Sequence, residues 1–182
     1  MTDVVATTLA LLAVALQVVV GAFLLVALLS TVWAPARRAR DAVRALLAGT
    51  ELALAWVVAL TATLGSLYFS EIADFIPCEL CWFQRIAMYP LALVLFLAVV
   101  SRDRRGAYYA LPLPLVGAAV AAYHALIEWW PQLEPSGCTI GVPCSTKWIE
   151  ELGYVTIPVL ALTAFATIAT LLVLALRPLS DR

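Results

Sequence analysis

The chain has 182 residues, of which 64% are hydrophobic and only 13% are charged, and its formal net charge is −1. A mean hydropathy of +1.00 excludes an ordinary soluble protein. The small net charge gives no sign of a nucleic-acid partner. Several apolar runs are longer than the roughly 18 residues that mark a transmembrane helix. The sequence therefore predicts an all-α integral membrane protein surrounded by lipid.

Five apolar runs predict five membrane-spanning helices, at residues 4–33, 52–69, 78–100, 107–130 and 154–176. The first run is expected to be retained and not cleaved as a secretory signal. Asp3 precedes it and arginines follow it, which is the reverse of the charge order in a signal peptide. Pro112 and Pro114 fall in the first turns of the fourth run, where proline is tolerated and a bend is compatible with the sequence.

These runs divide the chain into three parts. Residues 1–33 are expected to form an extra N-terminal transmembrane helix, residues 34–50 a basic cytoplasmic linker, and residues 51–182 a four-helix bundle. An outer loop at 131–153 carries two of the four cysteines. Within it, Ser145 or Thr146 is expected to cap a short interfacial helix that runs to Gly153.

The distribution of positive charge orients the predicted helices. Nine of the eleven Lys and Arg residues lie in the linker, in the turn at 101–106 and in the C-terminal tail, which five helices place on one side. Only Arg85 and Lys147 fall on the other side, together with all four cysteines. The positive-inside rule then makes the C-terminus cytoplasmic and both cysteine pairs extracytoplasmic.

The cysteines occur in two close pairs, as expected for disulfide chemistry on the oxidising side of a membrane. Cys78 and Cys81 form a CxxC motif at the start of the third run, where a helix N-terminus favours thiolate. Arg85 falls on the same helical face as this pair. Cys138 and Cys144 lie in a glycine-containing loop that can bend back on itself, so a disulfide between them is sterically easy.

Two other interpretations of the cysteines are open. CxxC is a common half-site for zinc, but the second pair is widely spaced and His124 lies inside a predicted helix, so no metal is expected. The other alternative is two inert structural disulfides. A CxxC bridge is poorly suited to that role, because it is strained and easily reduced.

Arg85 and His124 are ionisable groups at nearly equal predicted depths inside the membrane, which marks a candidate functional site. The structural alternatives are that Arg85 extends to the lipid headgroups and that His124 makes a helix-to-helix hydrogen bond. Oxidation of two thiols releases two electrons and two protons, and a membrane quinone is a suitable acceptor at this depth. Arg85 would stabilise negative charge on the quinone carbonyl, and His124 would donate a hydrogen bond or proton. Gln84 is a further candidate at the quinone, with packing as its favoured alternative.

The motifs themselves resemble a known family. The stretch from Cys78 to Arg85 with the following Met88-Tyr89-Pro90, then Ala122-Tyr123-His124, then Cys138 to Cys144 followed by Thr156-Ile157-Pro158, closely resembles the bacterial disulfide-bond formation protein B family. The likeness is greatest to its Gram-positive-type C members and covers roughly residues 51–176. It implies a four-helix bundle in the bacterial inner membrane. Such a bundle reoxidises a secreted thioredoxin-like thiol oxidase (DsbA/BdbD-like) and passes the electrons to membrane quinone, either ubiquinone or menaquinone.

The resemblance also implies roles for single residues. Cys81 would face the quinone, Cys78 would exchange with the Cys138–Cys144 pair, and Arg85 and His124 would match residues at the quinone site. Cys81 and Gln84 complete the candidate quinone contacts. The first apolar run departs from the family pattern, and its role is open. A vitamin K epoxide reductase-like protein is the alternative from a related class, but in that family the loop pair precedes the CxxC pair.

Overall fold

The structure is a computed structural model that describes residues 2–134 and 142–177. These residues form seven α-helices and a single turn of 3-10 helix, η1 (Pro131–Leu133). The α-helices are α1 (Thr2–Leu29), α2 (Ala34–Leu47), α3 (Glu51–Glu71), α4 (Glu79–Val100), α5 (Gly106–Ala110), α6 (Pro112–Trp129) and α7 (Ile157–Leu176). With α5 and α6 taken as a single span, five are long and apolar enough to cross a membrane. The predicted all-α fold of five spans is therefore confirmed.

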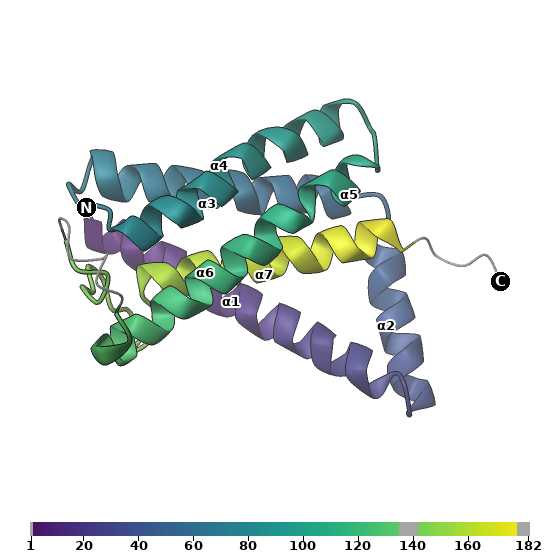
Figure 1. The fold of residues 1–182 in the computed structure, drawn as a ribbon. Coiled ribbons are helices and arrows are strands. Elements are labelled where there is room, and N and C mark those ends of the chain that lie inside the picture. The colour runs from purple at the N-terminus through teal and green to yellow at the C-terminus, as the bar shows by residue number, and fades with distance from the viewer. Residues whose placement is uncertain (1, 135–141, 178–182) are drawn as a thin grey trace.

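Helices α3, α4, α6 and α7 pack into a bundle, and α1 lies along the outside of α7 (Figure 1). The bundle core combines many alanines with a smaller number of large apolar side chains, among them Leu91 and Leu95 of α4 and Phe165 and Ile168 of α7. Gly117 of α6 lies directly against the Phe165 ring, which a Cβ at this position would overlap. Helices α6 and α7 can therefore approach closely only because residue 117 has no side chain.

Helix α1 packs through one narrow face. Its buried residues are Ala6, Ala10 and Ala13, spaced by one turn so that they lie on one side of the helix. Small side chains on that side let α1 approach α7 closely. Beyond this contact α1 diverges from the bundle, and its far end meets α2, which lies across that end of the molecule (Figure 1).

Three local expectations are corrected or refined. The region predicted as a basic linker contains α2, because Ala, Arg and Leu are strong helix formers and Pro35 falls in its first turn, where it is tolerated. The fourth run divides at Leu111 into α5 and α6, because Pro112 and Pro114 have no N–H for the preceding turn.

The predicted helix from 145 or 146 to Gly153 is wrong. Glu151 and Val155 form an isolated antiparallel bridge, and the backbone between them reverses through positive φ angles at Leu152 (53°) and Gly153 (77°). Left-handed backbone at two successive residues cannot continue a right-handed helix.

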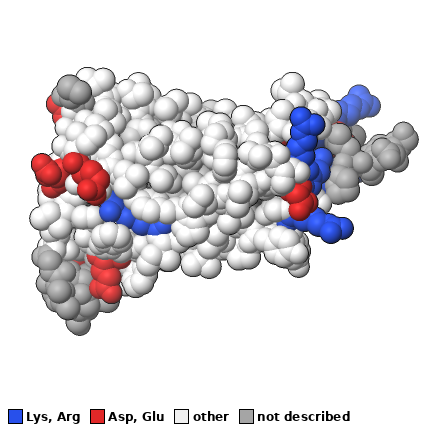
Figure 2. All heavy atoms as spheres, turned by 90° about the horizontal axis from the view of Figure 1, so that it is seen from above, with Lys and Arg blue, Asp and Glu red and all other residues white. Residues whose placement is uncertain are grey.

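The charges separate along the long axis of the bundle. Figure 2 shows Lys and Arg mainly at one end and Asp and Glu mainly at the other, with a largely uncharged surface between them. At the arginine-rich end, the Glu51 carboxylate lies 3.6 Å from an Arg104 guanidinium nitrogen. The N-terminal end of α1 and the start of α4 lie together at the opposite end (Figure 1).

Candidate active site

Cys78 and Cys81 lie at the N-terminus of α4, as the sequence predicts. Cys78 is the N-cap residue, with extended backbone, and its Sγ accepts a hydrogen bond from the Cys81 N–H at 3.4 Å. The two Sγ atoms are 3.1 Å apart, and both thiols are free. The pair is therefore reduced in this structure, and its sulfurs are close enough for a disulfide to form with little backbone movement.

The surroundings of Cys78 favour its thiolate. The pKa of the Cys78 thiol is lowered to about 4, chiefly because Cys81 hydrogen-bonds to its sulfur; burial opposes this effect and His124 adds to it. A thiolate is the reactive species in thiol–disulfide exchange, and a thiol of low pKa is also a good leaving group. Cys78 is therefore suited both to attack a disulfide and to leave when its own disulfide is broken.

His124 of α6 joins the two cysteine pairs. Its Nε2 lies 3.6 Å from Cys78 Sγ and 3.0 Å from the Cys144 carbonyl oxygen, and its Nδ1 lies 2.9 Å from Gln84 Nε2. Because the Gln84 amide nitrogen can only donate, Nδ1 accepts and Nε2 carries the ring proton. Nε2 then donates toward the Cys144 carbonyl and the Cys78 sulfur, so one imidazole holds the loop cysteine against the CxxC motif.

Cys144 is buried beside the CxxC motif. It is disulfide-bonded, only 1% exposed, and packs in one cluster with Cys78, Leu80 and Ile127. The Glu134 carboxylate accepts hydrogen bonds from the Cys144 N–H and, at 2.8 Å, from the Ser145 hydroxyl, which fixes the backbone at Cys144. Cys138 lies outside the described residues, so its pairing with Cys144 stays a prediction.

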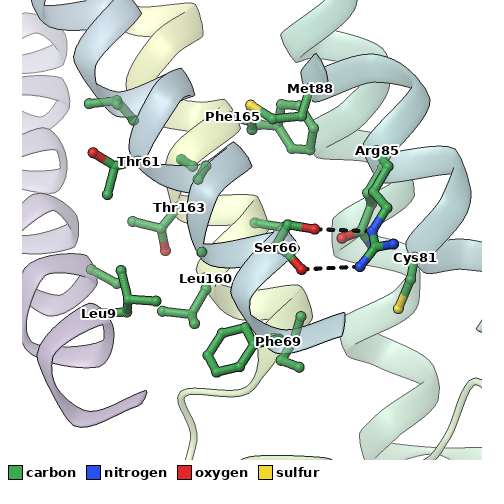
Figure 3. Close-up of a pocket in the computed structure, with 18 of the residues that line it drawn as sticks. Leu9, Thr61, Ser66, Phe69, Cys81, Arg85, Met88, Leu160, Thr163 and Phe165 are labelled. Carbon is green, nitrogen blue, oxygen red and sulfur yellow. Dashed lines mark hydrogen bonds between the residues drawn. The ribbon is translucent and has the colours of Figure 1, made fainter. Parts of the chain in front are cut away.

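A cavity of about 400 Å³ opens beside Cys81 (Figure 3). Its polar lining includes Cys81, Gln84 and Arg85, and the rest is mainly apolar, with aliphatic side chains of α1, α3 and α7 and several aromatic rings. Two further lining residues, Phe75 and Trp148, stack with ring centroids 5.0 Å apart. The cavity is thus apolar with a small polar side next to a reactive sulfur, the usual character of a small-molecule site.

Arg85 is held in the cavity wall by α3. Its Nε donates to the Ser66 hydroxyl at 3.0 Å, and its Nη2 donates to the Ser66 carbonyl at 3.1 Å (Figure 3). The guanidinium carbon also lies 5.1 Å from the centre of the Trp82 ring. These contacts turn the cation toward Ser66 and the cavity.

Comparison with known proteins agrees with this arrangement. The model of the family described as disulfide bond formation protein DsbB matches residues 49–176. The chain belongs to the DsbB family. It is 53% identical over 114 residues to disulfide bond formation protein C of Bacillus subtilis, a match that covers 62% of this chain and 83% of that protein. It is 46% identical over 132 residues to a probable disulfide formation protein of Deinococcus radiodurans, which covers 68% and 86% of the two chains. None of the solved structures matches significantly.

Membership of the DsbB family, together with five apolar spans, makes this chain a multi-pass membrane oxidoreductase of disulfide-bond formation, acting with a thiol-bearing partner protein. Helices α1 and α2 precede the segment that the DsbB model matches. The family assignment also decides against the vitamin K epoxide reductase-like alternative.

This DsbB-family chain brings most of the predicted site residues together, in two groups. Cys81, Gln84 and Arg85 line the cavity, whereas His124 is absent from its lining and contacts Cys78 and Cys144 instead. Gln84 is only 6% exposed and takes part in both groups, since it lines the cavity and hydrogen-bonds His124.

One observation supports the alternative that the cysteines bind zinc. Ligand atoms of Cys78, Cys81 and His124 all lie within 4.8 Å of one another, so the position of His124 inside a helix does not keep it from the cysteines. These are atoms that zinc uses. With Gln84 donating to Nδ1, however, Nε2 carries a proton and is not free to bind a metal.

Two residues that the sequence analysis passed over support the site. Ser66 holds Arg85, and its only signal in the sequence is a hydroxyl beside a glycine within an apolar run. Glu134 holds Cys144, and its signal is an acidic residue in the outer loop shortly before Cys138. Neither signal predicts which partner the side chain meets.

Proposed function

We propose that the chain reoxidises a thioredoxin-like extracytoplasmic thiol oxidase (DsbA/BdbD-like) and passes the electrons to a membrane quinone, ubiquinone or menaquinone. One observation carries the proposal: the two sulfurs of the CxxC motif face different neighbours. Cys78 belongs to the same buried cluster as Cys144 of the outer loop and does not line the cavity, whereas Cys81 packs against that cluster and also lines the apolar cavity. A pair placed in this way can receive electrons on one side and deliver them on the other.

The cavity residues fit a quinone. Arg85 and Gln84 offer donors for carbonyl oxygens, and the aliphatic lining suits an isoprenoid tail. A quinone bound there supplies an acceptor for two electrons and two protons beside Cys81. The Arg85 guanidinium, fixed by Ser66, stabilises negative charge in its neighbourhood without having to reorient.

The proposed relay begins at the outer loop. A thiolate of the reduced partner attacks the Cys138–Cys144 disulfide; the partner leaves as a disulfide, and both loop cysteines become thiols. A loop thiolate then attacks Cys78 in the oxidised Cys78–Cys81 pair. This breaks the Cys78–Cys81 bond, restores the loop disulfide and leaves Cys78 and Cys81 reduced. Renewed oxidation of that pair releases two electrons and two protons on the cavity side.

His124 and Glu134 keep the two pairs in register for this exchange, since both hold the backbone of Cys144. The first attack releases Cys81 and joins Cys78 to a loop cysteine in a mixed disulfide. The low pKa of Cys78 makes it a good leaving group when the second loop thiolate then attacks that loop cysteine. The loop needs to move only locally, because Cys78 and Cys144 already share one buried cluster.

The proposed setting is the bacterial cell membrane, with both cysteine pairs outside and the C-terminus in the cytoplasm. The separation of charge in Figure 2 supports this orientation, because the arginine-rich end would face the cytoplasm by the positive-inside rule. The CxxC motif then lies at the extracytoplasmic surface of the cell membrane, within reach of a secreted partner.

The test is to mix the purified protein with a reduced thioredoxin-like partner and a soluble quinone, and to follow quinone absorbance. Cys81→Ser is expected to abolish quinone reduction, and Arg85→Ala to raise the KM for quinone. An alkylating agent added to the reduced protein should stop turnover, and a metal chelator should leave it unchanged. Unchanged quinone kinetics in both variants would refute the assignment, and loss of activity with the chelator would favour the zinc alternative.

A further inference from the structure

Helix α1 precedes the segment that the DsbB model matches, yet it forms part of the cavity beside the CxxC motif. Leu9, Leu12, Ala13 and Leu16 of α1 line this cavity. In Figure 3, Leu9 lies on the opposite side of the cavity from Arg85 and Cys81, with Leu160 and Thr163 of α7 between them. Helix α1 therefore supplies part of the cavity wall that lies across from the reactive sulfur.

Polar contacts fix the position of this wall. Gln17 of α1 donates from Nε2 to the Thr163 hydroxyl at 2.8 Å and accepts at Oε1 from the Tyr154 hydroxyl at 2.8 Å. Nearer the N-terminus, the Thr7 hydroxyl donates to the Glu151 carboxylate at 3.2 Å. An amide in an apolar span is costly unless both of its ends are satisfied, and the half-buried Gln17 has a partner at each end. These bonds favour one register of α1 against α7.

Leu9 also reaches α3. A Cβ built on Gly65 would stand 3.1 Å from Leu9 Cδ1, so Leu9 fills the space that the missing side chain of Gly65 leaves. The α1 wall is thus held to α7 by a hydrogen bond and approaches α3 closely where Leu9 meets Gly65. Leu9 and Leu16 are half-buried and Leu12 is 51% exposed, whereas the half of α1 beyond Val18 is largely exposed.

The chemistry of the two sides differs. The side next to Cys81 carries Gln84, Arg85 and Ser66, whereas the α1 residues that line the cavity are all aliphatic. A membrane quinone has the same division, with a polar ring joined to an isoprenoid tail. We propose that α1 forms the tail-binding wall of the quinone site, with the first isoprenoid units lying against Leu9, Leu12 and Leu16. This inference rests on the proposed function, in which the ring occupies the side next to Arg85 and Cys81.

The test measures quinone binding without turnover, by quenching of tryptophan fluorescence in the full-length protein in detergent. Two ligands with the same ring are compared, one without a tail and one with a ten-carbon chain. Leu9→Ala/Leu16→Ala should weaken binding of the tailed quinone about tenfold, because apolar groups are lost from an apolar pocket, and leave the tail-free ring unaffected. The matched control is Leu11→Ala/Leu25→Ala, which changes two leucines of α1 that are 56% and 57% exposed and should alter neither affinity.

Failure of this inference can be told from failure of the proposed function. Arg85→Ala should weaken both quinones alike, because it acts on the ring. If wild type binds the tailed quinone no more tightly than the tail-free one, or if the Leu9/Leu16 variant equals wild type, the α1 wall is refuted while the quinone site stands. If wild type binds neither quinone, both proposals fall.

A second measurement needs no variant. A quinone with a photoreactive group on its first isoprenoid unit is bound to the wild-type protein, irradiated and mapped by mass spectrometry. Labelling within α1 that an excess of unlabelled tailed quinone suppresses supports the proposal. Labelling confined to α3, α4 and α7 overturns it. Labelling of α1 that the competitor leaves unchanged would mean that a lipid acyl chain fills this side, which also overturns it.

Discussion

Replacing Ser66 by alanine tests whether α3 positions the cation at the candidate quinone site. Arg85 makes two hydrogen bonds to Ser66, one to the hydroxyl and one to the carbonyl, and Ser66→Ala removes only the first. A hydrogen bond to a charged group contributes about 1.5–3 kcal/mol, and we take the lower end because Arg85 is only half-buried. Since about 1.4 kcal/mol corresponds to a factor of ten, we expect quinone affinity to fall roughly tenfold.

The assay is a quinone titration under steady state, with KM and kcat separated, followed by a direct binding measurement. KM should rise while kcat changes little, because the guanidinium remains present but is less well oriented. Ser66→Thr keeps the hydroxyl and should restore most of the affinity. Ser70→Ala is the matched control, since Ser70 lies one turn further along α3 and bonds only the local backbone and Glu71. A normal KM in Ser66→Ala, alongside a strongly raised KM in Arg85→Ala, would refute this role of Ser66.

Three further predictions concern the sulfurs, the loop and the core. Because its pKa is lowered to about 4, Cys78 in the reduced protein should stay thiolate above that pH, and its absorbance near 240 nm should vanish as the pH falls through about 4. Cys81→Ala removes the chief cause of the lowered Cys78 pKa and should move this transition to higher pH. A transition at the same pH would contradict the role given to Cys81. Glu134→Ala should slow exchange between the cysteine pairs several-fold without changing the rate at which a prereduced CxxC pair reduces quinone, because it releases only the Cys144 backbone. Equal slowing of both steps would assign Glu134 another role. Gly117→Ala should destabilise the fold by about 1–3 kcal/mol, measured by thermal unfolding, since its Cβ would overlap the Phe165 ring. A stability equal to wild type would show that the helices adjust freely there.

Much of the fold can be predicted from the sequence because membrane insertion depends on hydropathy averaged over a whole segment. A run of about 20 apolar residues specifies a span whatever it packs against, so the five spans could be placed to within a few residues. The start of α4 at Cys78 could be placed too, because a polar loop changes to an apolar run at that residue. Hydropathy says less about segments without a long apolar run, such as the predicted linker, which contains α2, and the turn at Leu152, which was taken for a helix.

The site was harder to predict than the fold, because it depends on which helix faces meet. The sequence placed Arg85 on the face of the cysteines, but it could not show that Ser66 of another helix would hold it. His124 was expected at the quinone on the basis of its depth and of the family resemblance. The structure places it between Cys78 and Cys144, since rotation of α6 about its axis, which depth does not specify, decides what the imidazole contacts.

A single-turnover experiment tests the division of the relay most directly. Two double variants, Cys138→Ser/Cys144→Ser and Cys78→Ser/Cys81→Ser, are fully reduced, freed of reductant and mixed with excess quinone. The account predicts that the variant retaining only the CxxC pair forms one quinol per protein and that the variant retaining only the loop pair forms none. Quinol formation by the loop pair alone, or its absence with the CxxC pair alone, would contradict the claim that electrons leave the protein at Cys81.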